Sequence, residues 1–130
     1  HGALYMMASK RPDLAAAISS AVRDFDPSLA LYVLPGSEAE RAAREAGLAV
    51  RREFFADRPY VGADVVMFGW TYEQLGGPRG AAARVTDMLG DSTFDPIETI
   101  CVHSDTDNAP ELVRAVRSAL RERGVDCGQT

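Results

Sequence analysis

Residues 48–60 of the chain, LAVRREFFADRPY, pass from a strand-forming segment directly into charged and aromatic residues. We predict a β-strand for residues 48–55. Asp57, Arg58 and Tyr60 follow the end of this strand. In a parallel α/β sheet, functional side chains collect where strands end and lead into the next helix. These three residues are therefore candidates for a functional site.

A helix, a strand and a second helix are predicted before this segment. Four apolar residues at spacings of four, four and three predict one face of a helix: Leu14, Ile18, Val22 and Phe25. Pro12 suits the first turn of that helix. Residues 29–34 are an almost continuous apolar run, as expected for a strand covered on both faces. Ser37 and Glu40 form a capping-box pattern that opens a short helix, and Gly47 closes it.

Strands and helices also alternate after this segment. Residues 65–68 are a short strand candidate. Beyond the Gly-Gly-Pro breaker at residues 76–78, a helix is indicated by Ala81, Ala82, Val85, Met88 and Leu89. Residues 97–102 form a clear strand. Asn108 is a predicted N-cap of the last helix, which Gly124 closes and which carries Leu112, Val113, Val116 and Leu120.

This alternation of strands and helices predicts parallel βαβ units, and therefore an α/β fold. The chain has 130 residues, which is room for one domain, so we predict a single domain over residues 1–130.

The motif His103-Ser104-Asp105 lies just past the strand at residues 97–102. An imidazole and a carboxylate in this position could bind a metal, orient a base or hold a substrate. The alternative is that Asp105 and the polar residues after it, among them Thr106, only cap the next helix. The sequence leaves these two interpretations equally open.

Asp57 and Arg58 form the second candidate pair. The planar fork of Arg58 suits a carboxylate or phosphate, and Asp57 could hold that fork or act as a base. A structural ion pair within the loop is the alternative. Alternation along the strand places Arg51 and Glu53 on one face, which is either solvated or lines a site. Trp70 is expected to pack with its loop onto the core, and a stacking platform is the alternative.

Composition excludes several classes of protein. The formal net charge is −5 and there is no basic tract, so a nucleic-acid partner is not expected. No apolar run approaches the roughly 20 residues that cross a bilayer, and no signal peptide is visible. We therefore expect a cytoplasmic protein, in which Cys101 and Cys127 are reduced thiols.

Three segments, in this order, resemble signatures of the LamB/YcsF family. They are His-Gly-Ala-Leu-Tyr at residues 1–5, Phe-Ala-Asp-Arg-Pro-Tyr at residues 55–60 and Ile-Cys-Val-His-Ser-Asp at residues 100–105. Residues 31–37, LYVLPGS, are similar to the family's strand-to-helix corner. The resemblance runs through most of the chain, and the joint order of the segments is more specific than any one of them.

The resemblance implies the C-terminal half of a distorted seven-stranded (β/α) barrel related to polysaccharide deacetylases. It also implies the A-subunit of an ATP-dependent 5-oxoprolinase, which opens 5-oxoproline to L-glutamate with two partner subunits. ATP would be the cofactor, and a divalent metal is possible, with unknown ligands. A separate N-terminal half, or a homo-oligomer, would then complete the barrel.

Matching residues carry the implied roles. Asp57, His103 and Asp105 would serve in proton transfer or metal contact, and His1, Arg58 and Tyr60 in substrate binding.

Three departures from the family pattern support an alternative. Met6 stands where the family usually has Asn, and Ser104 replaces a Gly. Phe68 lies near the place of an expected Arg. The alternative is therefore a truncated, catalytically inactive remnant that acts as a binding or assembly module. A metal-dependent, deacetylase-like hydrolase is a third hypothesis, supported by fold analogy alone.

Overall fold

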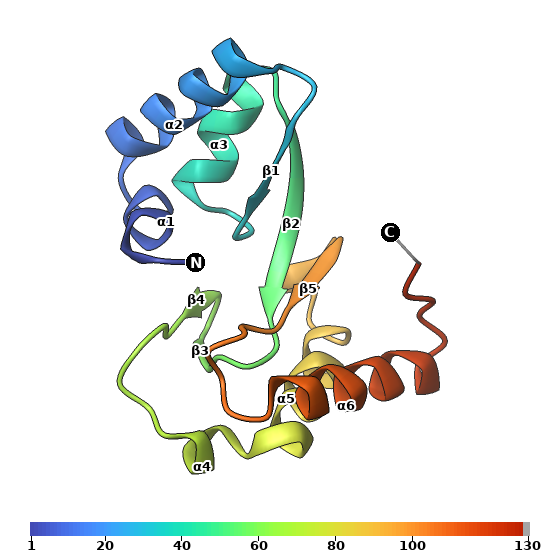
Figure 1. Ribbon diagram of the computed structural model, residues 1–130. Coiled ribbons are helices and arrows are strands. Elements are labelled where there is room, and N and C mark those ends of the chain that lie inside the picture. Colours follow the sequence, from blue (N-terminus) through green and yellow to red (C-terminus); the bar gives the residue numbers. More distant parts are fainter. Residues whose placement is uncertain (129–130) are drawn as a thin grey trace. The chain divides into compact units, whose positions relative to one another are not determined.

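The computed structural model describes residues 1–128, and the chain forms two compact units (Figure 1). Unit 1 comprises His1–Glu53 and Ile97–Thr99, and unit 2 comprises Phe54–Pro96 and the residues from Ile100 onward. Strands β2 (Ala49–Phe55) and β5 (Thr99–Cys101) contribute residues to both units.

Unit 1 combines three helices with the first strands of a parallel sheet. Its further elements are α1 (Ala3–Ala8), α2 (Pro12–Phe25), β1 (Ala30–Val33) and α3 (Glu38–Glu45). The core of this unit is formed by Val33, Ala43, Leu48 and Val50. These residues come from β1, α3 and the start of β2, so the core closes one βαβ unit, as the alternating pattern predicts.

The parallel sheet has the strand order β1-β2-β5. β1 and β2 pair in parallel, with register from Ala30 opposite Ala49 to Val33 opposite Arg52. Along β5, Glu98 N donates to Arg52 O, and further on Ala56 N donates to Cys101 O. These bonds advance in the same direction along both strands, so β5 is parallel to β2. The α/β fold with a parallel sheet is confirmed, whereas the seven-stranded barrel remains a prediction.

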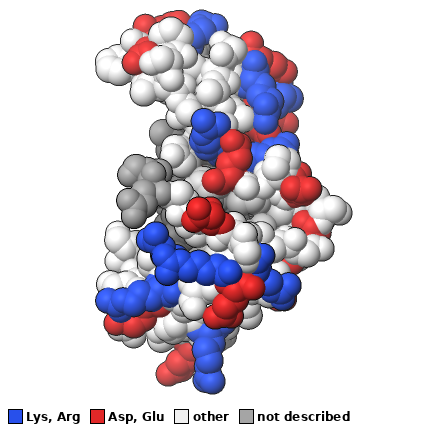
Figure 2. Space-filling model, turned by 90° about the vertical axis from the view of Figure 1, so that its right-hand side faces the viewer, with Lys and Arg blue, Asp and Glu red and all other residues white. Residues whose placement is uncertain are grey.

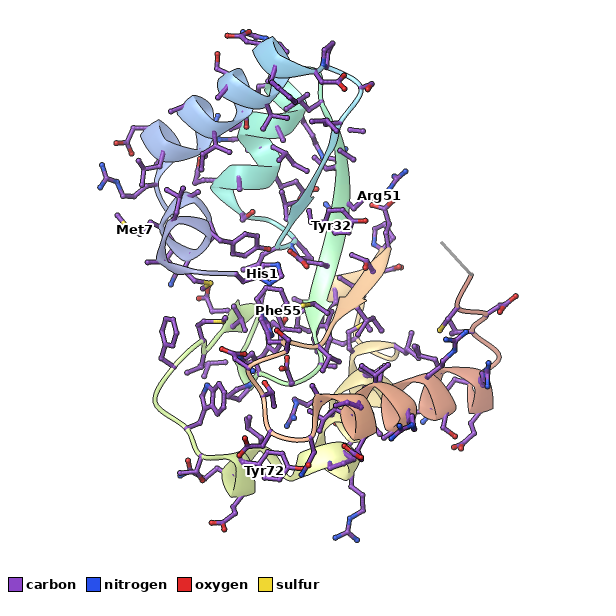
Figure 3. All side chains as sticks on the ribbon, viewed as in Figure 1. His1, Met7, Tyr32, Arg51, Phe55 and Tyr72 are labelled. Atoms are coloured by element: carbon purple, nitrogen blue, oxygen red, sulfur yellow. The ribbon has the colours of Figure 1, made fainter. Side chains whose placement is uncertain are left out.

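One prediction about packing in unit 1 holds in part, and a second is wrong. The buried residues of α2 are Ala15 and Ser19, and Phe25 is 84% exposed. Of the four predicted residues, Val22 packs against the core of this unit, and Leu14 and Ile18 are half-buried. β1 is not covered on both faces either, because Tyr32, the register partner of Arg51, is exposed (Figure 3).

Helix α3 begins as the capping pattern predicts, with one difference. Ser37 Oγ accepts a hydrogen bond from Glu40 N at 3.2 Å. The Glu40 carboxylate, however, accepts from Gly36 N at 2.8 Å, one residue before the N-cap. Its other oxygen accepts from Arg52 Nε at 2.7 Å and from Arg44 Nη2 at 2.8 Å. Glu40 is therefore a buried carboxylate that ties α3 to β2.

We expect Glu40→Gln to destabilise the chain by about 2 kcal/mol, because it removes hydrogen bonds to a buried charge. Burial would raise the Glu40 pKa, but the bonds from Arg52, Gly36 and Arg44 outweigh it and lower the pKa. This stabilisation is therefore complete above the pKa of the unfolded state and is lost as pH falls through the lower folded pKa.

Urea unfolding of wild type and Glu40→Gln at pH 7 and at pH 3 to 4 measures this difference. The gap in unfolding free energy should shrink at the lower pH. Glu45→Gln is the matched control, because Glu45 pairs with Arg41 on the exposed side of the same helix and should change little. Equal effects of the two substitutions would contradict the role given to Glu40.

Unit 2 is built on two packed helices. Its further elements are β3 (Tyr60–Val61), β4 (Asp64–Val65), α4 (Tyr72–Leu75), α5 (Gly77–Met88), η1 (Ser92–Phe94) and α6 (Ala109–Glu122). α5 packs against α6, and their buried residues are Ala81, Val85, Met88, Leu112, Val116 and Leu120. The predicted apolar positions of both helices include these core residues.

Local predictions in unit 2 have mixed outcomes. Residues 65–68 are not one strand, because β4 ends at Val65 in a short antiparallel hairpin with β3. Gly77 and Pro78 start α5 rather than preceding it, because proline suits the first turn of a helix. Asn108 holds the N-cap position, but its φ is 57° and its side chain makes no capping bond. Helices α1 and α4 were not predicted.

The structure bears on three further predictions, which concern the surface charges, membrane-spanning segments and the two cysteines. On the face drawn in Figure 2, basic and acidic side chains lie next to one another. None of the helices described for residues 1–128 combines the length and apolarity needed to cross a bilayer. Neither Cys101 nor Cys127 forms a disulfide within the described residues, and their reduced state stays a prediction.

Candidate functional site

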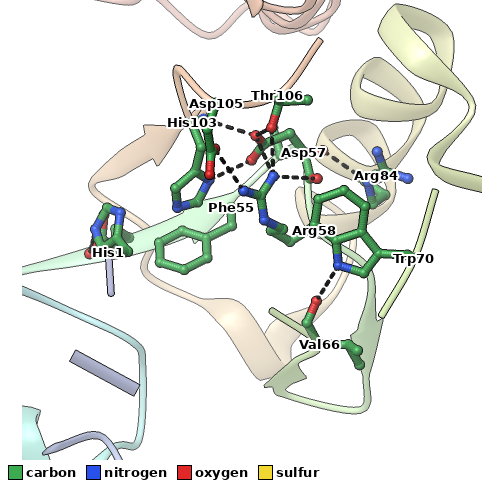
Figure 4. A network of polar contacts seen from close by, with 12 residues as sticks. His1, Phe55, Asp57, Arg58, Val66, Trp70, Arg84, His103, Asp105 and Thr106 are labelled. Carbon is green, nitrogen blue, oxygen red and sulfur yellow. Dashed lines mark hydrogen bonds and ion pairs between the residues drawn. The ribbon is translucent and has the colours of Figure 1, made fainter. Parts of the chain in front are cut away.

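The ends of β2 and β5 bring two sequence candidates together in unit 2. The backbone hydrogen bond from Ala56 N to Cys101 O joins the carboxyl ends of the two strands. Asp57 and His103 therefore leave neighbouring strand ends, and their side chains meet at 2.9 Å between Oδ1 and Nδ1 (Figure 4). The edge of the His103 ring meets Phe55, with centroids 4.7 Å apart. This is the arrangement expected at the carboxyl ends of parallel strands.

Asp57 is fully buried and accepts hydrogen bonds from three residues. Its Oδ1 faces His103 Nδ1, and its Oδ2 accepts from His103 N at 2.9 Å. Oδ2 also accepts from Thr106 Oγ1 at 2.6 Å and from Arg58 Nη1 at 2.8 Å. Both oxygens thus accept hydrogen bonds from the protein, and Asp57 holds His103, Thr106 and Arg58 in place.

These donors decide the ionisation of Asp57. Burial alone would raise the Asp57 pKa, but hydrogen bonds from His103 and Thr106 and the positive charge of protonated His103 outweigh it. The pKa of Asp57 is therefore lowered, and the side chain is a carboxylate at neutral pH.

The charge of Asp57 fixes which nitrogen of His103 carries the proton. An ionised carboxylate can only accept hydrogen bonds, so Nδ1 of His103 is the donor in this pair. In the neutral imidazole, Nε2 then carries the lone pair. A buried histidine oriented in this way by a carboxylate is suited to take up and release a proton at Nε2.

Arg58 is held in place on several sides. Its Nη1 donates to Asp57 and, at 2.7 Å, to Thr106 Oγ1, and its Nη2 donates to Asp105 Oδ1 at 3.1 Å. The guanidinium carbon lies 4.5 Å from the centroid of the Trp70 ring, a cation–π contact. Trp70 in turn donates from Nε1 to Val66 O at 3.1 Å. Trp70 is thus a stacking platform, for an arginine of the chain itself.

Of the two interpretations of the His103-Ser104-Asp105 motif, the capping one is wrong, because α6 begins after Asn108 without a side-chain cap, and the functional one stays a prediction. Thr106, expected to serve only as a helix cap, is buried and bridges Asp57 and Arg58. The Asp105 side chain is 80% exposed, yet one oxygen contacts buried Arg58. Ser104 is exposed, so its side chain does not fill the cluster of Asp57, Arg58 and His103.

Arg84, which lies on α5, was not among the sequence candidates. Its Nε donates to Ala56 O at 2.8 Å and its Nη1 to Leu75 O at 2.9 Å. Burial lowers the Arg84 pKa, and the negative charge of Asp57 partly opposes this shift. Arg84 therefore ties α5 to the end of β2, directly before Asp57. A lone arginine in a helical pattern gave no signal of this role.

Tyr60 lies in an aromatic cluster of the same unit. Its ring stacks on Phe54 with centroids 4.6 Å apart, and its hydroxyl accepts from Phe55 N at 2.9 Å. A pocket of about 340 Å³ next to this cluster is lined by Tyr60, Phe54, Phe94, Arg84, Asp87 and Asp91. A volume of this size suits a small molecule. The substrate-binding role expected for Tyr60 stays a prediction.

His1 belongs to a polar cluster of unit 1. Its Nε2 lies 3.0 Å from Glu53 Oε1, and Tyr5 donates from its hydroxyl to the same oxygen at 2.7 Å. Glu53 is buried, whereas Arg51 pairs with Glu98 at 3.0 Å. The strand face expected to carry both charges is therefore divided between a buried cluster and an exposed ion pair.

The fold and the polar cluster define an α/β protein with an oriented histidine at the carboxyl ends of parallel strands. The sequence model of the LamB/YcsF family matches residues 1–130. The chain belongs to the LamB/YcsF family.

Relatives and a solved structure agree with this assignment. The chain is 39% identical over 136 residues to the 5-oxoprolinase A-subunit of Thermus thermophilus, covering 97% of the chain and 54% of that protein. It is 41% identical over 139 residues to the 5-oxoprolinase A-subunit of Symbiobacterium thermophilum, covering 98% and 53%. The crystal structure of a lactam utilization protein from Thermus thermophilus matches with a TM-score of 0.74 at 38% identity, covering 97% and 54%. The chain spans about half the length of these relatives.

Proposed function

We propose that the chain is part of the A-subunit of an ATP-dependent 5-oxoprolinase, which works with two other subunits in the cytoplasm. The enzyme would open the cyclic amide of 5-oxoproline to L-glutamate with ATP hydrolysis. The names of the relatives support the substrate. The observation that carries the proposal is the buried pair of His103 and Asp57, which supplies a group able to move a proton.

The chemistry of the reaction explains what such a pair would do. An unstrained lactam is unreactive, and phosphorylation of its oxygen by ATP would open the ring carbon to attack by water. Cleavage of the carbon–nitrogen bond, with a proton going to the ring nitrogen, would then give a glutamyl acyl phosphate, which is hydrolysed to glutamate and phosphate. His103 would accept the proton of this water at Nε2, while Asp57 holds the ring and stabilises the cation that forms. Arg58 would bind an anionic group of the substrate or nucleotide. Asp105 is the exposed carboxylate of the cluster and would contact the bound reactants.

His1, in unit 1, and Tyr60, in unit 2, are proposed as substrate-binding residues because they match the family signatures. ATP belongs to the proposal as the second substrate, and a divalent metal could accompany it. Asp57 does not fit as a metal ligand in this arrangement, because both of its oxygens already accept hydrogen bonds. We therefore assign no residue of the described chain to a metal, and no chemical step to the metal.

The test is an assay of the assembled enzyme. The protein that contains this chain is combined with the two other subunits, and glutamate and ADP are measured with and without 5-oxoproline. We expect glutamate to form, and ADP release to depend on 5-oxoproline. The corresponding protein of Thermus thermophilus serves as the positive control. No glutamate from a folded, assembled complex, beside an active control, would instead favour the inactive binding or assembly module.

A further inference from the structure

One edge of the Arg58 guanidinium is only half occupied. Nη1 is bonded to Asp57 and Thr106, and Nη2 contacts Asp105 Oδ1 at 3.1 Å. Nε is buried and finds no hydrogen-bond acceptor among residues 1–128. Arg58 is 2% exposed, so this donor is shielded from solvent. A buried donor without an acceptor costs free energy and requires an explanation.

The geometry of the guanidinium explains why Arg58 Nε has no acceptor. The Nε and Nη2 hydrogens on one edge of an arginine point in the same direction and match the two oxygens of a carboxylate or phosphate. Asp57 and Thr106 hold Nη1 and fix the plane of the group, so the edge is oriented before any ligand arrives. Asp105 contacts only one half of this edge.

We propose that the Nε–Nη2 edge of Arg58 is a binding site for a carboxylate or phosphate, and that Asp105 occupies it until a ligand arrives. The Asp105 side chain is 80% exposed and can therefore leave the edge without unpacking a core. A ligand anion that replaces it gains two parallel bonds and satisfies Nε. The inference rests on the proposed function for the identity of the ligand, which is the carboxylate of 5-oxoproline or a phosphate of the nucleotide.

Trp70 makes this site observable. Its ring lies over the Arg58 guanidinium, and it is the one tryptophan of the 130 residues. Because the ring covers the face of the cation, exchange of Asp105 for a ligand changes the surroundings of the indole. The tryptophan fluorescence of the chain therefore reports on the surroundings of Trp70.

The experiment titrates the 130-residue chain with 5-oxoproline, acetate and inorganic phosphate at constant ionic strength and follows the Trp70 fluorescence. We expect a saturable change in the wild type. Asp105→Asn should bind the anion about tenfold tighter, as follows if Asp105 occupies the edge for roughly nine-tenths of the time. Arg58→Lys keeps the charge but lacks the fork, and should show no saturable change.

Asp107→Asn is the matched control. Asp107 is an exposed carboxylate two residues further along the same loop, and its substitution changes the net charge of −5 by the same amount. It should leave the affinity unchanged. Tighter binding of 5-oxoproline and acetate identifies the substrate carboxylate as the ligand class, and tighter binding of phosphate identifies the nucleotide.

Three results would each overturn the proposal: no saturable change in the wild type, equal affinities of Asp105→Asn and Asp107→Asn, or saturable binding by folded Arg58→Lys. If Arg58→Lys fails to fold, the comparison of the two aspartate variants still decides. The titration needs neither ATP nor partner subunits. Its failure and the failure of the 5-oxoprolinase assay are therefore separate results.

Discussion

We expect His103→Gln to lower the turnover of the assembled 5-oxoprolinase about a thousandfold, within the range that positioned acid–base groups contribute. Glutamine keeps a side chain of similar polarity but cannot take up a proton. The substitution removes the imidazole that contacts Asp57, but it keeps the backbone bond from His103 N to Asp57 and the bond from Thr106 to Asp57. The loss should therefore appear in kcat more than in KM.

Asp57→Asn should lower turnover by a similar factor for a different reason. The amide can present a donor to His103 Nδ1 and so reverse the tautomer, which removes the lone pair from Nε2. Because both substitutions disable the same proton transfer, the double variant should be about as active as either single variant. Independent, multiplicative losses would show that the two residues do not act as one unit.

Folding has to be monitored in these variants, because Asp57 is buried. Circular dichroism and urea unfolding of each variant establish whether it is folded under the assay conditions. Asp107→Asn is again the control, with no expected change in turnover. If folded His103→Gln retains wild-type turnover, His103 has no part in proton transfer.

The second large effect concerns Gly80, on the side of α5 that meets the end of α4. A Cβ built on Gly80 would lie 1.9 Å from Leu75 O and 2.9 Å from Leu75 C. That carbonyl also accepts from Arg84 Nη1, so it is held from both sides. We expect Gly80→Ala to destabilise the chain by about 3 kcal/mol or more, because backbone must move to accommodate the methyl group.

The sign of this effect is informative, since alanine within a helix is ordinarily about 1 kcal/mol better than glycine. Gly90→Ala provides the comparison. Gly90 follows α5, and a Cβ there would approach Asp87 O at 3.5 Å, an ordinary contact. Urea unfolding should show little change or slight stabilisation for Gly90→Ala and a large loss for Gly80→Ala. Stabilisation by both would mean that α4 and α5 do not meet as described.

The order of the main elements could be predicted because their signals are local. The apolar run before Pro35 predicted β1, and the pattern at Ser37 predicted the start of α3. The short helices α1 and α4 were missed because each has too few residues to show a period. Residues 65–68 were apolar enough for a strand, but pairing with β3 ends at Val65. Strand pairing depends on a partner that the segment itself does not specify.

The candidate site was likewise predicted only in part. Its chemical groups were visible in the sequence, because Asp57 and Arg58 follow one predicted strand and His103 and Asp105 another. The ion pair of Asp57 and Arg58 was also predicted and is confirmed. The bonds from these two residues to His103 and Asp105 were not visible, because they join positions more than 40 residues apart. Thr106 was expected only as a helix cap, and Arg84 was not among the candidates, since a threonine before a helix and an arginine within one are common.

By itself, the sequence determined the α/β class, the family signatures and the strand ends at which polar residues gather. These follow from local chemistry: apolar periodicity, capping and the position of polar residues after strands. Only the tertiary structure decided that both oxygens of Asp57 accept hydrogen bonds, that His103 carries its proton on Nδ1, and that Arg58 Nε is buried without an acceptor among residues 1–128. Those properties depend on burial and on donors from distant segments, which exist only after the strands have paired.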